Sequence, residues 1–191
     1  MGMRPGSDIK SPYRLFLPDK FYSQFSIAFT LKLVDPTGGF LFAVVNPLET
    51  SKYYFQVVEL GVSVTGLGPG QSNVSLLYTD LSTGLYTSQT LASFRVPTSF
   101  TSWSSVGLTV RDDRVDISFN CQPLDSIIVN REPKELIFDS ASTLYIGQAG
   151  PIVKGALHVS TMFLFLTLFS YKNGQWIHVV TCNIFFFHIK L

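Results

Sequence analysis

The sequence predicts an all-β fold, a two-sheet antiparallel jelly-roll sandwich, and three observations predict it. Aromatic residues make up 14% of the chain and charged residues another 14%, whereas about 25% of residues are charged in ordinary soluble domains. Short runs in which apolar and polar residues alternate recur along the chain, and sustained helical periodicity is nearly absent. Clusters of Gly, Pro, Asp and Asn separate these runs, as turns separate the strands of a sandwich.

The first clear strand is expected from Phe25 to Leu33, where apolar residues alternate with small or polar ones. Asp35 to Gly39 predicts a turn, because Pro presets its own φ and Gly accepts positive φ. A returning strand is expected at Phe40 to Val45. Further strands are expected at residues 53–59, 74–78, 91–96, 105–110, 115–120 and 143–147.

Turn clusters at Gly66 to Gly70 and at Arg111 to Arg114 separate some of these strands. The one helical piece that we expect is a short turn near Pro133 to Leu136. Trp103 is expected in the core, because buried aromatic side chains dominate the cores of sandwiches.

The stretch after residue 158 differs in kind from what precedes it. It holds an apolar run from Met162 to Phe169 and a second one that ends at Phe187, both far short of the roughly 20 residues that span a bilayer. One interpretation is a hairpin that turns at Asn173-Gly174. The other is a sticky terminal extension, since uncharged Phe/Leu/Ile runs favour aggregation, and we expect the tail to pack poorly.

Several segments, in their order along the chain, resemble a known family. They include residues 12–18 leading into 25–27, then 38–43, 74–79, 92–97, 103–110, 115–121, 144–150 and 154–157. Together they resemble the thrombospondin amino-terminal-like (laminin G-like) domain of non-fibrillar collagens, nearest to the collagen type XV and type XVIII group. The resemblance implies a laminin G-like domain over residues 1–158 and a divergent hydrophobic tail over residues 159–191.

The same resemblance implies an extracellular location. The first residues contain no apolar run suitable for a signal peptide, and no Gly-X-Y repeat is present. We therefore expect a short isoform or a fragment of a secreted collagen-type protein.

Two cysteines are compatible with one disulfide or with two inert thiols, and they lack the spacing of metal ligands. The resemblance implies that Cys121 pairs with a cysteine beyond the closing strand, a position for which this chain offers only Cys182. Both a Cys121–Cys182 disulfide and a buried free thiol at Cys121 stay open.

The residues that catalysis or metal binding would need are missing from the sequence. A retaining glycosidase needs two carboxyl groups about 5 Å apart, yet the one acidic cluster, Asp112-Asp113-x-x-Asp116, coincides with a turn signal. The three histidines at positions 158, 178 and 188 do not predict a zinc site, and Asp80 and Asp113 lack the acidic neighbours that calcium prefers. We expect no catalytic residues, no metal and no cofactor.

The sequence therefore predicts a non-enzymatic extracellular-matrix domain, an adhesive module for matrix proteins or heparan sulfate. Nucleic acid is excluded as the main partner by the net charge of +1, and no membrane span is expected. Asn73-Val74-Ser75 is a glycosylation sequon. The alternative function is a carbohydrate-binding lectin or glycosidase-like protein on the same fold. Candidate contacts to heparan sulfate are Arg95, Arg111, Arg114, Arg131 and Lys134.

Overall fold

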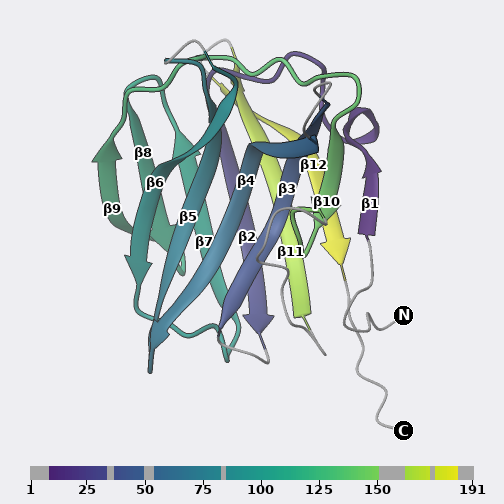
Figure 1. Cartoon of the computed structure of the whole chain (residues 1–191). Coiled ribbons are helices and arrows are strands. Elements are labelled where there is room, and N and C mark those ends of the chain that lie inside the picture. Colours follow the sequence, from purple (N-terminus) through teal and green to yellow (C-terminus); the bar gives the residue numbers. More distant parts are fainter. Residues whose placement is uncertain are drawn as a thin grey trace, which may run out of the picture.

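The computed structural model describes residues 9–33, 37–49, 54–82, 85–150, 162–172 and 175–184. In it the chain is a sandwich of two antiparallel sheets of six strands each (Figure 1). The all-β, two-sheet prediction is confirmed. The only helical element among the described residues is a 3-10 turn at Tyr13–Leu15, so no helix there is long and apolar enough to cross a membrane.

The first sheet has the strand order β1-β10-β3-β4-β5-β6. Its strands are β1 (Ile9–Pro12), β3 (Gly38–Glu49), β4 (Tyr54–Gly68), β5 (Gln71–Asp80), β6 (Thr87–Val96) and β10 (Thr143–Ile146).

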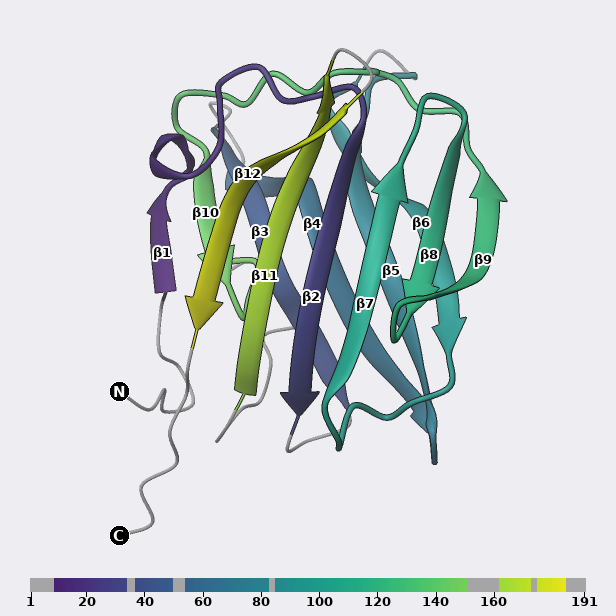
Figure 2. The ribbon, with the colours of Figure 1, turned by 180° about the vertical axis from the view of Figure 1, so that it is seen from behind.

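The second sheet, which faces the viewer in Figure 2, has the order β12-β11-β2-β7-β8-β9. Its strands are β2 (Phe25–Leu33), β7 (Ser104–Val110), β8 (Arg114–Phe119), β9 (Gln122–Ile128), β11 (Met162–Lys172) and β12 (Gln175–Ile184).

Alternate residues of the facing strands fill the space between the sheets. In β2 the apolar positions from Phe25 to Leu33 are all buried, while the residues between them are partly or fully exposed. This alternation is the period of 2 that identified the strand from the sequence. β3 behaves differently, because Phe42 and Val44 join the main core while Ala43 and Val45 join a second apolar cluster on the opposite face. A strand buried on both faces reads as a continuous apolar run.

Two expectations about local structure are wrong. Pro133 to Leu136 forms no helical turn; its backbone is irregular and leads into a bridge between Lys20 and Ile137. Trp103 is 47% exposed rather than buried. It directly precedes β7, whose buried residues begin at Ser104, so strand alternation directs Trp103 away from the core.

The described part of the tail belongs to the second sheet. β11 pairs with β2 from Met162↔Leu33 to Ser170↔Phe25, and Leu168 is 7% exposed within the main core. β11 and β12 pair antiparallel with Lys172 opposite Gln175, as the hairpin interpretation requires, although Asn173 and Gly174 lie outside the described residues. The domain boundary at residue 158 also lies outside them and stays a prediction.

Candidate functional site

Connecting segments cover one end of the sandwich, which we call the loop rim. It comprises residues 13–24, 81–86, 111–113 and 129–142, of which residues 83 and 84 are outside the described part. Backbone hydrogen bonds join these segments: Phe21 N–H donates to Leu136 O (2.7 Å), Phe138 N–H to Asp19 O (3.0 Å), and Leu81 N–H to Glu132 O (3.0 Å). The rim is therefore a connected surface built from segments far apart in the sequence.

Aromatic packing anchors the rim to the core. Phe138 is 3% exposed, and its ring centroid lies 5.2 Å from that of Tyr13 and 5.5 Å from that of Phe21. The Tyr13 hydroxyl donates to Asp19 Oδ1 at 2.8 Å, and Phe138 O lies 3.2 Å from the same hydroxyl. Because Phe138 is fixed in this way, its exposed neighbours on either side, Ile137 and Asp139, are held at defined positions on the surface.

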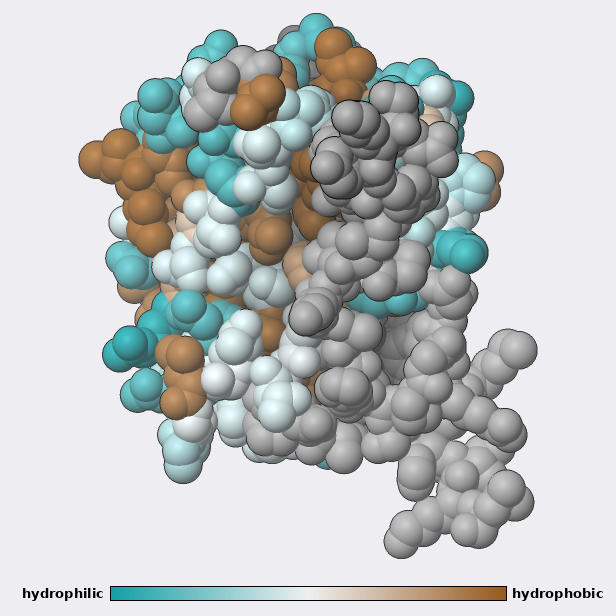
Figure 3. Space-filling view, in the orientation of Figure 1, coloured by the Kyte–Doolittle hydropathy of each residue, from teal (hydrophilic) through white to brown (hydrophobic). Residues whose placement is uncertain are grey.

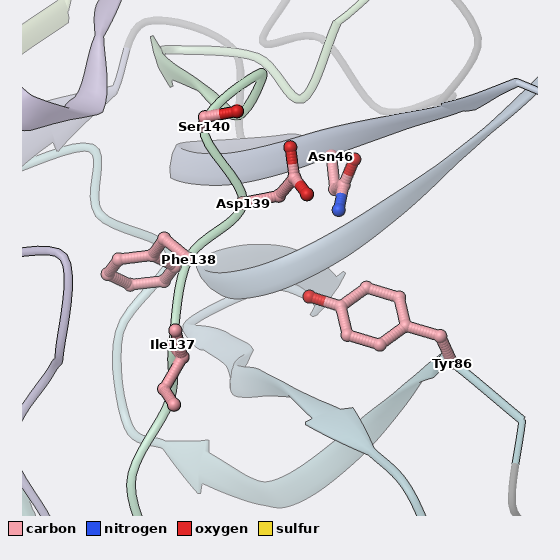
Figure 4. Close-up of a pocket in the computed structure, with 6 residues that line it drawn as sticks. All are labelled: Asn46, Tyr86, Ile137, Phe138, Asp139 and Ser140. Atoms are coloured by element: carbon pink, nitrogen blue, oxygen red, sulfur yellow. The ribbon is translucent and has the colours of Figure 1, made fainter.

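A pocket of about 400 Å³ opens in this rim (Figure 4). Figure 4 shows the Asp139 and Asn46 side chains turned toward one another, with the Tyr86 hydroxyl pointing toward the rim segment. Asn46 comes from β3 and is 5% exposed, while Tyr86 directly precedes β6. The lining residues are Asn46, Tyr86, Ile137, Phe138, Asp139 and Ser140.

A fully buried carboxyl group lies behind the pocket lining, bonded to two of its residues. Glu59 is 0% exposed, and the Tyr86 hydroxyl donates to its Oε1, as does Asp139 N–H at 3.4 Å. Its second oxygen, Oε2, has no hydrogen-bond partner. Burial raises the pKa of Glu59 above its ordinary value, although hydrogen bonding with Ser142, Tyr86 and the Asp139 backbone acts in the opposite direction. Burial and the adjacent Glu59 together raise the pKa of Tyr86.

A β-bulge explains how a glutamate comes to lie there. In the β3–β4 ladder Val44 pairs with Leu60 and Val45 pairs with Val58, so Glu59 is the extra residue. A bulge redirects the side chains around it and often lies beside functional sites. Strand alternation alone does not predict a carboxyl group at 0% exposure in this apolar sheet. The sequence analysis therefore did not identify Glu59.

Large apolar side chains are exposed around the same rim. Nine such side chains are exposed among the described residues, and six of them belong to the rim or to the strand end beside it: Leu15, Phe16, Leu81, Leu85, Ile128 and Ile137. Ile128 is 87% exposed at the end of the edge strand β9, and Ile137 is 71% exposed. Figure 3 shows several separate apolar patches on this face, one of them at the upper left, where β8 and β9 lie in Figure 1.

The predicted heparan sulfate contacts do not form one cationic surface. Arg131 is 1% exposed, so its assignment as a contact is wrong. It donates to the backbone oxygens of Ser23, Lys134 and Arg111 and to the Tyr78 hydroxyl, and thereby ties the rim segments together.

The remaining candidates are divided between the two ends of the molecule. Arg111 and Arg114 both pair with Asp116, at 3.0 and 3.5 Å, and Lys134 Nζ donates to Asp112 O at 2.5 Å. Arg95 is exposed near the end of β6, and the chain continues from there to Phe100, which bonds to the far end of β2. Arg95 therefore lies at the end opposite to the rim.

Asn73 lies on the outer face of the first sheet, half-buried, in β5. Its Nδ2 donates to Ser93 Oγ at 2.9 Å, and Ser75 of the same sequon lies 2.9 Å from that hydroxyl. Glycosylation at Asn73 stays a prediction.

Cys121 is an exposed free thiol, which corrects the expectation of a buried one and leaves the Cys121–Cys182 disulfide unformed in this structure. Cys121 follows β8, whereas Cys182 lies in β12, four strands away across the sheet. At a strand spacing of about 4.8 Å the two positions are about 19 Å apart, and a disulfide joins Cα atoms less than about 7 Å apart.

No group of three or more His, Cys, Asp or Glu side chains within the described ranges could hold a metal ion. Asp80 caps the Ser82 N–H at 2.9 Å, and the Asp113 backbone accepts from Val129 N–H at 2.8 Å. Both residues thus have local structural roles. His158 and His188 lie outside the described residues.

No family model matches the chain. In sequence it is 28% identical over 137 residues, 72% of its length, to the human collagen alpha-1(XVIII) chain, and it spans only 7% of that protein. In structure it is similar to mouse laminin alpha1 domains LG4-5, with a TM-score of 0.52 at 12% identity, covering 95% of this chain and 45% of that one. The chain thus resembles the collagen alpha-1(XVIII) chain in sequence and a laminin G-like domain in fold. The resemblance stated from the sequence is confirmed.

In size the chain corresponds to one of the two laminin domains, because it covers 45% of a chain that holds both. Another similar structure is the CBM40 of the Ruminococcus gnavus IT-sialidase, with a TM-score of 0.52 at 10% identity, 87% of this chain and 88% of that one. At this identity the similarity shows the sandwich fold alone.

Proposed function

We propose that the chain is a non-enzymatic adhesive domain of the extracellular matrix that binds another matrix protein through the loop rim. Collagen XVIII and laminin are extracellular-matrix proteins, and similarity to them supports the location. The observation that carries the proposal is the set of exposed apolar side chains around the rim. Exposed large apolar side chains concentrated at one end of a soluble domain often mark a surface that a partner covers.

Protein is a better-supported partner than heparan sulfate. Sulfated chains require several free Arg or Lys side chains that converge on one surface. At the rim, Arg131 is buried, Arg111 and Arg114 share Asp116, and Arg14 pairs with Asp19 at 2.8 Å. Lys20 pairs with Glu135 at 2.6 Å. Carboxylates therefore neutralise most of the cationic charge that the rim exposes.

The rim geometry also supports a role without catalysis. Glu59 and Asp139 are neighbours, but Glu59 is 0% exposed. A glycosidase needs both carboxyl groups in contact with the scissile bond, and a buried glutamate does not reach a substrate. A lectin-like function stays the alternative.

The test measures binding of the purified chain to immobilised laminin, fibronectin, fibrillar collagen and heparin. The rim variant Ile128→Asp/Ile137→Asp is compared with Leu67→Asp/Leu124→Asp, which also changes two exposed apolar side chains but leaves the rim intact. We expect saturable binding to at least one of these proteins, weakened about tenfold or more by the rim variant only. Retention by heparin alone, or equal loss in both variants, would overturn the proposal.

A further inference from the structure

We propose that the rim pocket of Asn46, Tyr86, Asp139 and Ser140 binds the ammonium group of a lysine side chain on the partner protein. This inference rests on the proposed function, because it names the group that the adhesive surface would take from its partner. The acceptors, the charge and the shape of the pocket support it.

Hydrogen-bond acceptors that an ammonium group needs line the pocket. Asp139 is exposed; its Oδ1 accepts from Ala141 N–H at 2.8 Å, and no bond to Oδ2 occurs within the described part of the chain. The Tyr86 hydroxyl donates its own proton to Glu59 and is itself hydrogen-bonded by Asn46 and Thr79, so it has no proton left to direct at a ligand in the pocket. Asn46 and Ser140 add an amide oxygen and a hydroxyl oxygen. A lysine ammonium carries three donors and no acceptor, which suits such a set.

The ionisable carboxyl groups in and behind the pocket are acidic, so any charge they carry is negative. Asp139 lines it, Glu59 lies behind Tyr86, and none of the lining residues is basic. Lys20 bridges to the pocket residue Ile137 through the backbone, but its Nζ is held by Glu135 at 2.6 Å. A sulfated or carboxylated ligand would be repelled here, whereas a cation would be attracted.

Glu59 is an independent second observation. It is fully buried, its Oε1 receives bonds from two residues of the pocket wall, and its Oε2 and the Ser142 hydroxyl have no partner of normal hydrogen-bond geometry, although Ser142 lies close enough to lower the pKa of Glu59. A buried carboxyl group with an unused acceptor costs stability unless something compensates it. A cation held against Tyr86 and Asp139 would favour the charged form of this carboxyl group, so binding would also release a proton wherever Glu59 is protonated in the free domain.

The shape fits a long side chain with a charged end. The pocket of about 400 Å³ is open to solvent, and Ile137, 71% exposed, offers an apolar wall for the methylene groups of a lysine. The exposed apolar residues around it would pack against the rest of the partner surface.

The experiment titrates the isotope-labelled chain with the peptide acetyl-Gly-Lys-Gly-amide and follows backbone amide shifts by NMR. We expect saturable shifts at Asn46, Asp139 and Ala141, and none with the same peptide acetylated on the lysine Nζ. Asp139→Asn should weaken binding about tenfold, because it removes the charge while its Oδ1 still accepts from Ala141. Asp125→Asn, an exposed aspartate on β9, is the matched control and should change nothing.

Equal shifts with the acetylated peptide, or equal affinity of Asp139→Asn and the parent chain, would overturn the inference. So would calcium chloride if it alone reproduced the same shifts while the lysine peptide did not. The proposed function can fail separately. If the chain binds the peptide but no matrix protein, the lysine-binding pocket is supported and the adhesive function is overturned. If Ile128→Asp/Ile137→Asp abolishes matrix binding and Asp139→Asn leaves it intact, the adhesive function is supported and the role of a partner lysine is overturned.

Discussion

Glu59 is the residue whose environment departs furthest from what its chemistry prefers. Its carboxyl group is fully buried and its pKa is raised by that burial. A raised pKa means that the folded chain binds this proton more tightly than the unfolded chain does. The contribution of Glu59 to stability is therefore greatest below its unfolded pKa of about 4.5 and is lost as pH rises through the folded value.

Glu59→Gln should remove this pH dependence. The glutamine oxygen can still accept from Tyr86, and its amide carries no charge to bury. We expect the free energy of unfolding of the variant to equal or exceed that of the parent at pH 8, and to decline less between pH 4.5 and pH 8. Urea denaturation at the two pH values measures this, with Glu132→Gln, an exposed glutamate, as control. An unchanged pH dependence would contradict the assignment.

Arg131 shows that a residue predicted for binding can be structural. Its side chain donates to three backbone oxygens and to Tyr78, and its guanidinium carbon lies 5.4 Å from the centre of the Tyr78 ring. Arg131→Met should lower the free energy of unfolding by about 3 kcal/mol, because several buried acceptors lose their donor together. Arg114→Met, which breaks an exposed ion pair, should cost less than about 1 kcal/mol. Thermal and urea unfolding compare the two; similar losses would contradict the buried role.

At the scale of the element, the β8–β9 hairpin turns through two residues that both have positive φ. Phe119 pairs with Gln122, and between them Asn120 has a φ of 47° and Cys121 a φ of 65°. Two-residue hairpins of this kind prefer Asn followed by Gly. The prediction ended the strand at Asn120 but did not recognise the turn, because Cys stands where Gly would signal it.

Cys121→Gly should therefore stabilise the chain. Glycine adopts positive φ without the steric cost that a Cβ incurs, and the gain should be about 1 kcal/mol in the free energy of unfolding. Cys121→Ala is the matched control, since it removes the thiol but keeps the Cβ, and it should give no gain. A gain of equal size in both variants would instead point to the thiol.

Most strands could be predicted because their pattern is local. β2, β7 and β10 alternate or carry apolar runs that sequence reasoning detects, and the predicted bounds lie within about one residue of those observed. β9 was missed because every residue except Ile127 is exposed, so no apolar period marks it. The pocket could not be predicted, because a bulge, a rim segment and the residue before β6 supply its side chains and only the folded chain brings them together.

At the scale of the whole molecule, the pairing of β11 distinguishes a tail that packs poorly from a tail that belongs to the sheet. The apolar sequence after residue 158 suggested poor packing, while the structure pairs β11 with β2 along nine residues. An interior strand should lose its amide protons to exchange only when the sheet opens. We expect amides of residues 162–172 to exchange as slowly as those of β2, measured by hydrogen–deuterium exchange and mass spectrometry on the full chain. Exchange of β11 within seconds, with β2 protected, would support the poorly packed tail.

The two sheets also determine how the domain would respond to tension. β1 and β12 are edge strands, one in each sheet, and Figures 1 and 2 place them on the same side of the molecule with their free ends toward the end away from the rim. A pull applied at Ile9 and Ile184 would load the outermost rung of each ladder first and then the next. Such a load opens a sheet like a zipper, at low force, before it reaches β3 or β2. The rim is at the opposite end, so a stretched domain would yield along β1 and β12 before the load reached the rim segment that begins at Tyr13.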